Sequence, residues 1–141
     1  MATEQLTTFL VDGQHIGISV TAVQEVLPAQ PMTRVPLAPP EVAGLLNLRG
    51  DVVTAVDVRR RLGLPERPAD EEPVNVVVRC GSDRVSLLVD CLADVVDVDD
   101  ESFEESPEGL QGALRELVLG AYKQKEGLLI VLDAERVSRF G

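Results

Sequence analysis

Residues 44–65 read GLLNLRGDVVTAVDVRRRLGLP, and this stretch decides the fold. Its first apolar run ends at Arg49 and Gly50, where glycine supplies the conformational freedom that a tight turn requires. The following segment, 52–56, is rich in β-branched residues and predicts a second strand. The stretch therefore predicts two strands joined by a turn that displays Arg49.

The second strand is followed by the pattern of a short capped helix. Asp57 can accept hydrogen bonds from the first free N–H groups of a helix over residues 58–62. Gly63 stands where a left-handed C-cap is expected, and Pro65 prevents the helix from continuing. We therefore expect strand, turn, strand and helix in twenty-two consecutive residues.

Composition indicates an ordered and acidic globular protein. The chain has 141 residues, is 45% apolar and contains no Trp, one Tyr and three Phe, so its core is predicted to be aliphatic. The net charge of −11 opposes non-specific binding to nucleic acid or to an anionic membrane. No apolar run is long enough to span a membrane or to form a leader segment. We expect a cytoplasmic protein that binds other proteins, without nucleic acid and without direct membrane insertion.

Most apolar segments are short and separated by turn residues, which favours small barrels or a sandwich of strands. A Pro-rich and charged stretch, 65–73, interrupts the pattern and is the best candidate linker. The predicted strands lie near residues 6–12, 15–19, 32–36, 42–48, 52–56, 74–80, 84–89, 115–122 and 128–132. The fold class is therefore mainly β with a few short helices.

The two halves of the sequence resemble one another. Residues 15–27 match residues 84–96 in apolar pattern, at a spacing of 69. Residues 51–61 match residues 127–137 at a spacing of 76, and both segments have a strand that ends in aspartate before a short helix. Two copies of one small β unit would leave this pattern.

Catalytic and metal-binding patterns are weak. His15 is the only histidine, and we expect it at the surface or at a strand edge; Cys80 and Cys91 are expected to be buried free thiols. Residues 90–108 contain nine acidic residues and no basic one, which predicts a solvated acidic loop and lacks the spacing of a calcium loop. We expect no enzyme activity, no metal and no cofactor. A small acidic hydrolase with two carboxylates in one pocket stays open as an alternative.

The chain resembles the CheW family of chemotaxis adaptors. The resemblance is carried by GLLNLRG with the strand and the RRRLGL segment after it, by VTAVQEVL, and by RVSLLVDCLADVV. It extends from about Gln5 to Arg139 and identifies residues 1–141 as a single CheW-like domain. It implies two packed SH3-like barrels of five strands each, with residues 14–66 in the first and residues 1–13 plus 74–141 in the second.

The resemblance also implies a function. Members of the family couple a CheA-type histidine kinase, through its regulatory domain, to the cytoplasmic hairpin tips of chemoreceptors in membrane-associated arrays. The alternative is a CheW-like coupling protein for another kinase pathway, linked to pili or to development. The residues implied for receptor binding are Val20, Val23, Gln24, Glu25, Leu48, Arg49 and Gly50. The residues implied for kinase binding are Leu92 and Val95.

Overall fold

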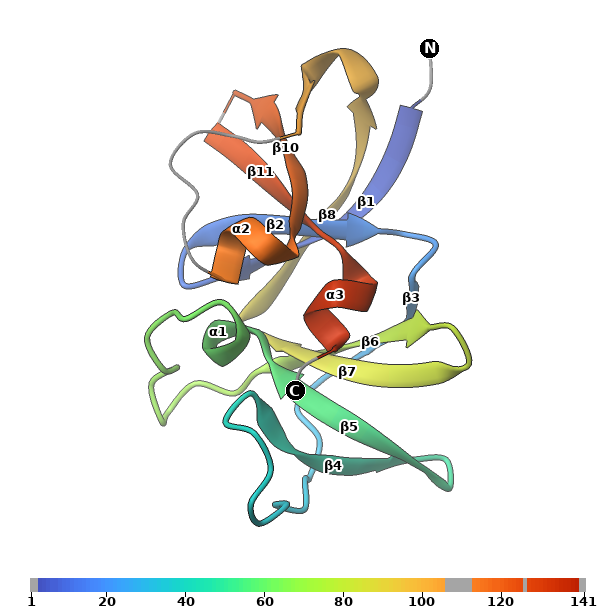
Figure 1. Cartoon of the computed structure of the whole chain (residues 1–141), viewed down its shortest axis with the longest axis vertical. Helices are drawn as coiled ribbons and strands as arrows, with labels where there is room; N and C mark the ends of the chain where they lie inside the picture. The colour runs from blue at the N-terminus through green and yellow to red at the C-terminus, as the bar shows by residue number, and fades with distance from the viewer. Residues whose placement is uncertain (1–2, 106–112, 126, 140–141) are drawn as a thin grey trace.

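The structure is a computed structural model and describes residues 3–105, 113–125 and 127–139. Its strands form two sheets, which Figure 1 shows one above the other. The lower sheet has the order β3 (Val23–Leu27), β6 (Val74–Cys80), β7 (Asp83–Val89), β5 (Asp51–Asp57), β4 (Val42–Leu48). The upper sheet has the order β8 (Cys91–Asp99), β1 (Thr3–Val11), β2 (Gln14–Ser19), β11 (Gly127–Leu132), β10 (Val118–Gln124), β9 (Phe103–Glu104). The short helices of the described ranges are α1 (Val58–Arg61), α2 (Ala113–Leu117), α3 (Ala134–Ser138) and the 3₁₀ turn η1 (Asp100–Ser102).

The mainly β class is confirmed, with one difference in strand number and one in strand membership. The upper sheet has six strands because the two-residue strand β9 pairs with β10. The sheets also divide the chain differently from the expected ranges. Strand β2 was expected in the first barrel and lies in the upper sheet, whereas β6 and β7 were expected in the second barrel and lie in the lower one. The expected boundary was the Pro-rich stretch at residues 65–73, but the chain crosses between the sheets after β2 and again after β7. Residues 65–73 instead connect two parts of the lower sheet.

Three segments differ from their expected structure. Residues 32–36 contain only an isolated bridge between Thr33 and Leu45, because the neighbouring prolines lack the N–H that a strand ladder needs. The expected strand at 115–122 begins as helix α2 and becomes β10 only at Val118. The acidic run at 90–108 is not simply a loop, because its first part is β8, a nine-residue strand paired with β1.

The predicted repeat occupies equivalent positions in the two sheets. Strand β5 pairs parallel with β7 in the lower sheet, and β11 pairs parallel with β2 in the upper sheet. Strand β5 ends in Asp57 and β11 is followed directly by Asp133, and each aspartate caps the next helix. Asp57 accepts from the backbone N–H of Arg59 at 3.0 Å, and Asp133 from that of Glu135 at 2.9 Å. The two caps have nearly the same backbone angles, φ −80° and ψ 113° against φ −82° and ψ 112°.

The buried apolar residues of the described ranges form three clusters. The largest lies between the sheets and includes Phe9, Val56, Val58 and Leu132. Two smaller clusters lie within the sheets, one around Leu46, Leu48, Val53 and Val77 in the lower sheet, and one around Leu6, Tyr122 and Leu129 in the upper sheet. Each sheet is therefore a small barrel with its own interior, and the shared cluster joins the barrels. In the ranges that the structure describes, no helix has the length and hydropathy needed to cross a membrane.

Candidate functional site

The hairpin between β4 and β5 has a tight turn with two residues in the left-handed region. Arg49 has φ +52° and Gly50 has φ +90°, the combination of a type I′ turn, which suits the twist of a two-stranded hairpin. The amide of Gly50 donates to the side-chain oxygen of Asn47 at 2.9 Å. The predicted positive φ of Gly50 is confirmed, and the turn holds Arg49 at the tip of the hairpin.

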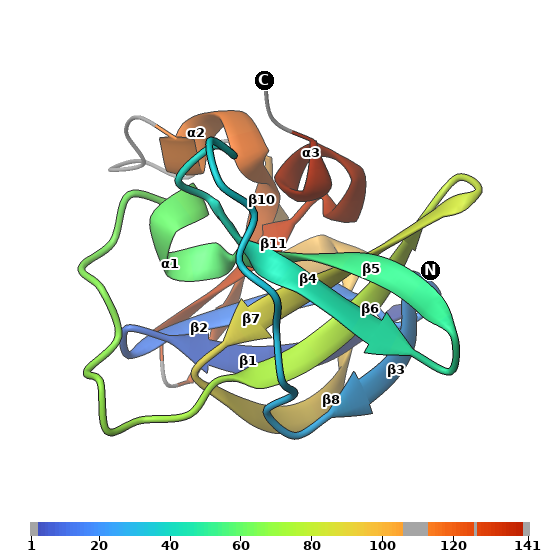
Figure 2. The ribbon, with the colours of Figure 1, turned by 90° about the horizontal axis from the view of Figure 1, so that it is seen from below.

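Arg49 forms a bidentate ion pair with Glu25 of β3. Its Nη1 atom donates to Oε2 of Glu25 at 2.8 Å, and its Nη2 atom donates to Oε1. The hydrogen bonds from Arg49 lower the pKa of Glu25 below its usual range. Strands β3 and β4 are the two edge strands of the lower sheet. The ion pair therefore links β3 to the turn that follows β4, that is, one edge of the sheet to the other. Figure 2 shows β3 close to the tip of the β4–β5 hairpin.

The other residues expected at a receptor site differ in exposure. Gln24 and Gly50 are exposed, and Val20 is half-buried. Val23 is half-buried and packs against the cluster between the barrels. Leu48 is only 6% exposed and belongs to the interior of the lower barrel, so it supports the turn from beneath and presents little surface to a partner.

A second ion pair lies beside the first and was missed by the sequence reasoning. Arg84 of β7 donates from Nη2 to Oδ2 of Asp51 at 2.5 Å. After the hydrogen bonds from Arg49, the positive charge of Arg84 also lowers the pKa of Glu25. No local sequence pattern indicates this pair, because it depends on the parallel pairing of β5 and β7.

Strand β8 carries the residues expected at a kinase site. Leu92 is 44% exposed and Val95 is 56% exposed. Strand β8 is an edge of the upper sheet, and Asp94 and Asp97 lie exposed between and beside the two apolar residues. The strand thus presents an apolar surface with acidic neighbours, and such charges are typical of edges protected from unwanted strand pairing.

Between the barrels, a cluster of charges is largely covered. Arg59 of α1 donates from Nε to both carboxylate oxygens of Asp90, at 2.9 and 3.2 Å, and Arg67 donates to the same carboxylate at 3.1 Å. Burial raises the pKa of Asp90, but the hydrogen bonds from Arg59 and Arg67 outweigh it, so this pKa lies below its usual range. Asp90 follows β7, at the second crossing between the sheets. The cluster therefore has a structural role at the junction.

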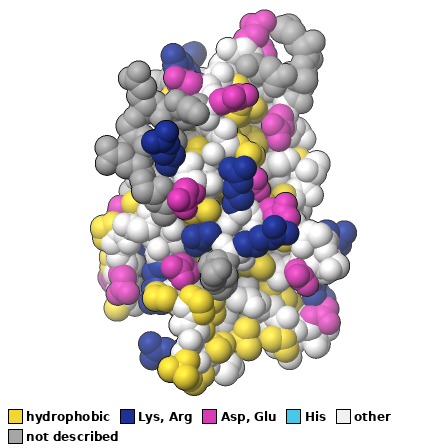
Figure 3. All heavy atoms as spheres, in the orientation of Figure 1, with side chains coloured by type: hydrophobic (Ala, Val, Ile, Leu, Met, Phe, Trp, Pro, Cys, Tyr) yellow, Lys and Arg dark blue, Asp and Glu magenta, His cyan; other side chains and the backbone are white. Residues whose placement is uncertain are grey.

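The Pro-rich loop between β3 and β4, residues 28–41, lies at the lower end of the molecule and exposes apolar side chains. Hydrophobic atoms gather at the lower end of the face in Figure 3, and Met32, Val35 and Leu37 of this loop are exposed. The amide of Ala38 donates to the carbonyl of Val35 at 3.4 Å, which closes a turn with Pro36 second and Leu37 third. Leu37 has φ +66° and a relative exposure of 104%, so a large side chain occupies a strained position without packing against the chain.

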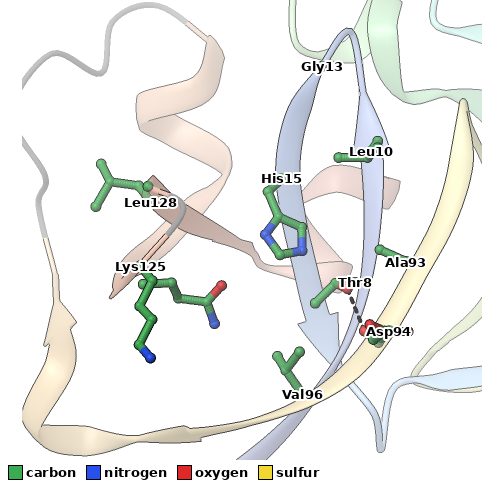
Figure 4. Close-up of a pocket in the computed structure, with 11 residues that line it drawn as sticks. Thr8, Leu10, Gly13, His15, Ala93, Asp94, Val96, Lys125 and Leu128 are labelled. Atoms are coloured by element: carbon green, nitrogen blue, oxygen red, sulfur yellow. Dashed lines mark hydrogen bonds between the residues drawn. The ribbon is translucent and has the colours of Figure 1, made fainter.

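The open end of the upper barrel forms a hollow of 590 Å³. Figure 4 shows His15 and Lys125 beside apolar residues such as Leu10, Val96 and Leu128. Among the described residues, Asp94 is the one carboxylate that lines this hollow, so they supply no pair of acids there for the hydrolase alternative. A hollow of 510 Å³ beside β5 is lined by two aspartates, Asp51 and Asp83, but Asp51 is paired with Arg84.

Cysteine and metal chemistry gain no support in the described part of the chain. Cys80 is half-buried and Cys91 is exposed, so the expectation that both thiols are buried is wrong for Cys91. Cys91 is exposed because it begins the edge strand β8. No group of three or more potential metal ligands occurs among the residues in the described ranges.

Comparisons with known proteins agree on one family. The model of the CheW-like domain matches residues 5–140. The chemotaxis protein CheW of Bacillus subtilis is 35% identical over 134 residues, which cover 95% of this chain and 86% of that protein. The chemotaxis protein CheW of Rhizobium meliloti is 29% identical and covers 94% of this chain and 86% of that protein. The crystal structure of the scaffolding protein TtCheW from Thermoanaerobacter tengcongensis has the same fold, with a TM-score of 0.88, 21% identity, and coverage of 99% of this chain and 95% of that one.

Proposed function

Because this chain belongs to the CheW-like domain family, we propose that it is a non-enzymatic adaptor coupling a CheA-type histidine kinase to the cytoplasmic tips of chemoreceptors. The observation that carries the proposal is the bidentate ion pair between Glu25 and Arg49. It holds an arginine in a defined orientation at the surface, and a planar guanidinium in such a position suits recognition of a partner's carboxylate or carbonyl groups. An adaptor acts through binding and through the conformations that binding favours.

The receptor contact would lie on the lower barrel. A helical hairpin tip would place an apolar stripe against the half-buried Val20 and Val23 and meet Gln24, Arg49 and Gly50 at the rim. Glu25 would orient Arg49, and Leu48 would support the turn from inside the barrel. These roles follow the exposure of each side chain.

The kinase contact would lie on the upper barrel, at Leu92 and Val95. The kinase partner would be the regulatory domain of a CheA-type enzyme. Because Leu92 and Arg49 belong to different sheets, the two proposed contacts use different barrels, and one chain can hold both partners together. Recruitment to membrane-associated receptor arrays would follow from receptor binding.

A three-way co-sedimentation tests the function. The full chain is mixed with the receptor signalling hairpin and the kinase regulatory domain of its own organism, with each pair measured separately. We expect a ternary complex that needs this chain. Binding of neither partner would overturn the proposal, and binding only to the kinase and receptor of a pilus- or development-linked pathway would assign the chain to that pathway.

A further inference from the structure

Two ion pairs stand next to each other at one end of the lower barrel. Glu25 is paired across the strands with Val77, a residue of the barrel interior, and Asp51 is paired with Leu48, another interior residue. Directly opposed residues point to the same side of an antiparallel sheet. Glu25 and Asp51 therefore both lie at the mouth of the barrel, each bonded to its own arginine.

Each pair has one exposed and one largely covered side chain, but the exposed member is a cation in the first pair and an anion in the second. In the first pair, the side chain of Arg49 is 73% exposed and that of Glu25 only 15%. In the second pair, the side chain of Asp51 is 70% exposed and that of Arg84 only 22%. The hairpin tip thus offers solvent one cation and one anion on either side of Gly50, each oriented from beneath by a covered counter-ion.

An exposed apolar side chain, that of Val52, follows Asp51 in the sequence. Val52 is 69% exposed, although valine at the neighbouring position 53 is buried in the barrel. The hollow of 510 Å³ next to it is lined by residues 51–54 of β5 and residues 82–85 around the start of β7. Asp51 and Val52 therefore both line this hollow, so a partner segment that enters it would meet an exposed carboxylate and an exposed aliphatic side chain.

We propose that Asp51, oriented by Arg84, is a specificity-determining residue of the receptor contact and takes a cationic side chain of the receptor tip. The proposal rests on the adaptor function above. Oδ2 of Asp51 is bonded to Arg84, and Oδ1 receives no hydrogen bond from the described residues, so one carboxylate oxygen is available to a donor. A receptor tip that fits would carry an anion or carbonyl group facing Arg49, a cation facing Asp51 and an aliphatic side chain on Val52.

The orientation by Arg84 is what separates this site from an ordinary surface charge. A free aspartate loses rotational freedom when it binds a partner, whereas Asp51 is already held. The Asp51 side of the pair is 70% exposed, and ion pairs that water reaches contribute little to fold stability. Reversal of the pair should therefore change recognition more than folding.

The test is a charge reversal that keeps the internal pair. The variant Asp51→Arg with Arg84→Asp leaves the net charge unchanged and presents a cation where the native protein presents an anion. The matched control is Glu135→Arg with Arg139→Glu, which reverses an exposed pair between α3 and its C-cap residue. Affinity for the receptor signalling hairpin is measured by calorimetry, and affinity for the kinase regulatory domain is measured in parallel.

We expect the Asp51–Arg84 reversal to weaken receptor binding at least tenfold, with kinase binding and melting temperature unchanged and with the control like the native protein. Replacing the matching Lys or Arg of the receptor hairpin with Glu should restore binding to the reversed variant. If the double variant does not fold, Asp51→Asn should weaken receptor binding about threefold.

The outcomes separate this inference from the adaptor function. If the native chain binds the receptor hairpin, Arg49→Glu removes the binding and the Asp51 variants leave it unchanged, the inference is wrong and the adaptor function stands. If the native chain does not bind the hairpin, both are overturned.

Discussion

Arg59 of α1 donates several hydrogen bonds to the carboxylate of Asp90, at the point where the chain passes from the lower barrel to the upper one. Nε of Arg59 lies 2.9 and 3.2 Å from the two carboxylate oxygens, and Nη2 lies 2.5 Å from one of them. The side chains are 8% and 14% exposed. Removing one member of a covered pair leaves the other without its partner, which is more costly than losing an exposed pair.

We therefore expect Asp90→Asn to lower the free energy of unfolding by roughly 2–3 kcal/mol, because Arg59 and Arg67 lose their shared anion. Urea denaturation at neutral pH measures the change. The control is Asp94→Asn, whose side chain is exposed on β8. An equal effect of both substitutions would contradict the structural role of Asp90.

The stability that Asp90 supplies should depend on pH in a defined window. Its pKa is lower in the folded protein than in the unfolded chain, where an aspartate titrates at about 3.9. The contribution is therefore fully present above the unfolded value and is lost as the pH falls through the folded value. The difference in unfolding free energy between native protein and Asp90→Asn should be constant from about pH 7 to 5 and shrink below about pH 4. A difference that grows on acidification would contradict this pKa direction.

Arg49→Glu should remove receptor binding and leave the fold intact. It places a second carboxylate against Glu25, while the surroundings stay open to water, so repulsion is screened. Calorimetry with the receptor hairpin measures binding, and circular dichroism verifies the fold. The exchange of both charges, Glu25→Arg with Arg49→Glu, should restore the internal pair without restoring binding. Unchanged binding of the single variant with native stability would remove Arg49 from the receptor site.

Gly50→Val should destabilise the hairpin through its backbone alone. An added Cβ atom would meet nothing within 4 Å, so no steric clash is involved, but φ +90° is unfavourable for a β-branched residue. We expect a loss of about 1–2 kcal/mol in unfolding free energy together with weaker receptor binding. Gly50→Asn, which tolerates positive φ better, should lose clearly less in both measurements. Native behaviour of the valine variant would contradict the turn geometry.

Leu37→Asn should stabilise the isolated protein. Leucine at φ +66° carries backbone strain, and its full exposure supplies no packing in return. Asparagine is far more common in this region, so we expect a gain of about 0.5–1 kcal/mol in unfolding free energy, measured by urea denaturation. The control is Met32→Gln, an exposed position in the same loop without a positive φ, which should be neutral. A loss of stability in Leu37→Asn would show that the leucine packs against the protein in solution.

The hairpin and its helix could be predicted because their causes are local. Gly50 and Asp57 act within a few residues, and the structure shows the expected positive φ and the expected cap. Glu25 and Arg49 were both implied for receptor binding by the family resemblance, and the structure joins them in an ion pair. The receptor and kinase roles of these and the other implied residues stay predictions.

The rest depends on pairing between distant segments. Asp51 meets Arg84 only because β5 and β7 lie parallel, which no local pattern indicates. Strand β8 was interpreted as a loop because its aspartates suggested solvent, yet an edge strand tolerates charges on its open side. Leu48 was implied for receptor binding, and its place on the inner face with Val53 depends on how the barrel closes. Strand order could not be predicted for a similar reason, since the upper barrel takes strands from both ends of the sequence and the lower barrel lies between them.

That arrangement has a consequence for dissection of the molecule. Because the chain crosses between the sheets after β2 and after β7, no single cut releases one complete barrel. A fragment that stops within residues 65–73 would lack β6 and β7 of the lower barrel and β8 to β11 of the upper one. Separately expressed halves should stay unfolded alone and regain structure only when mixed, because each half lacks strands of both barrels.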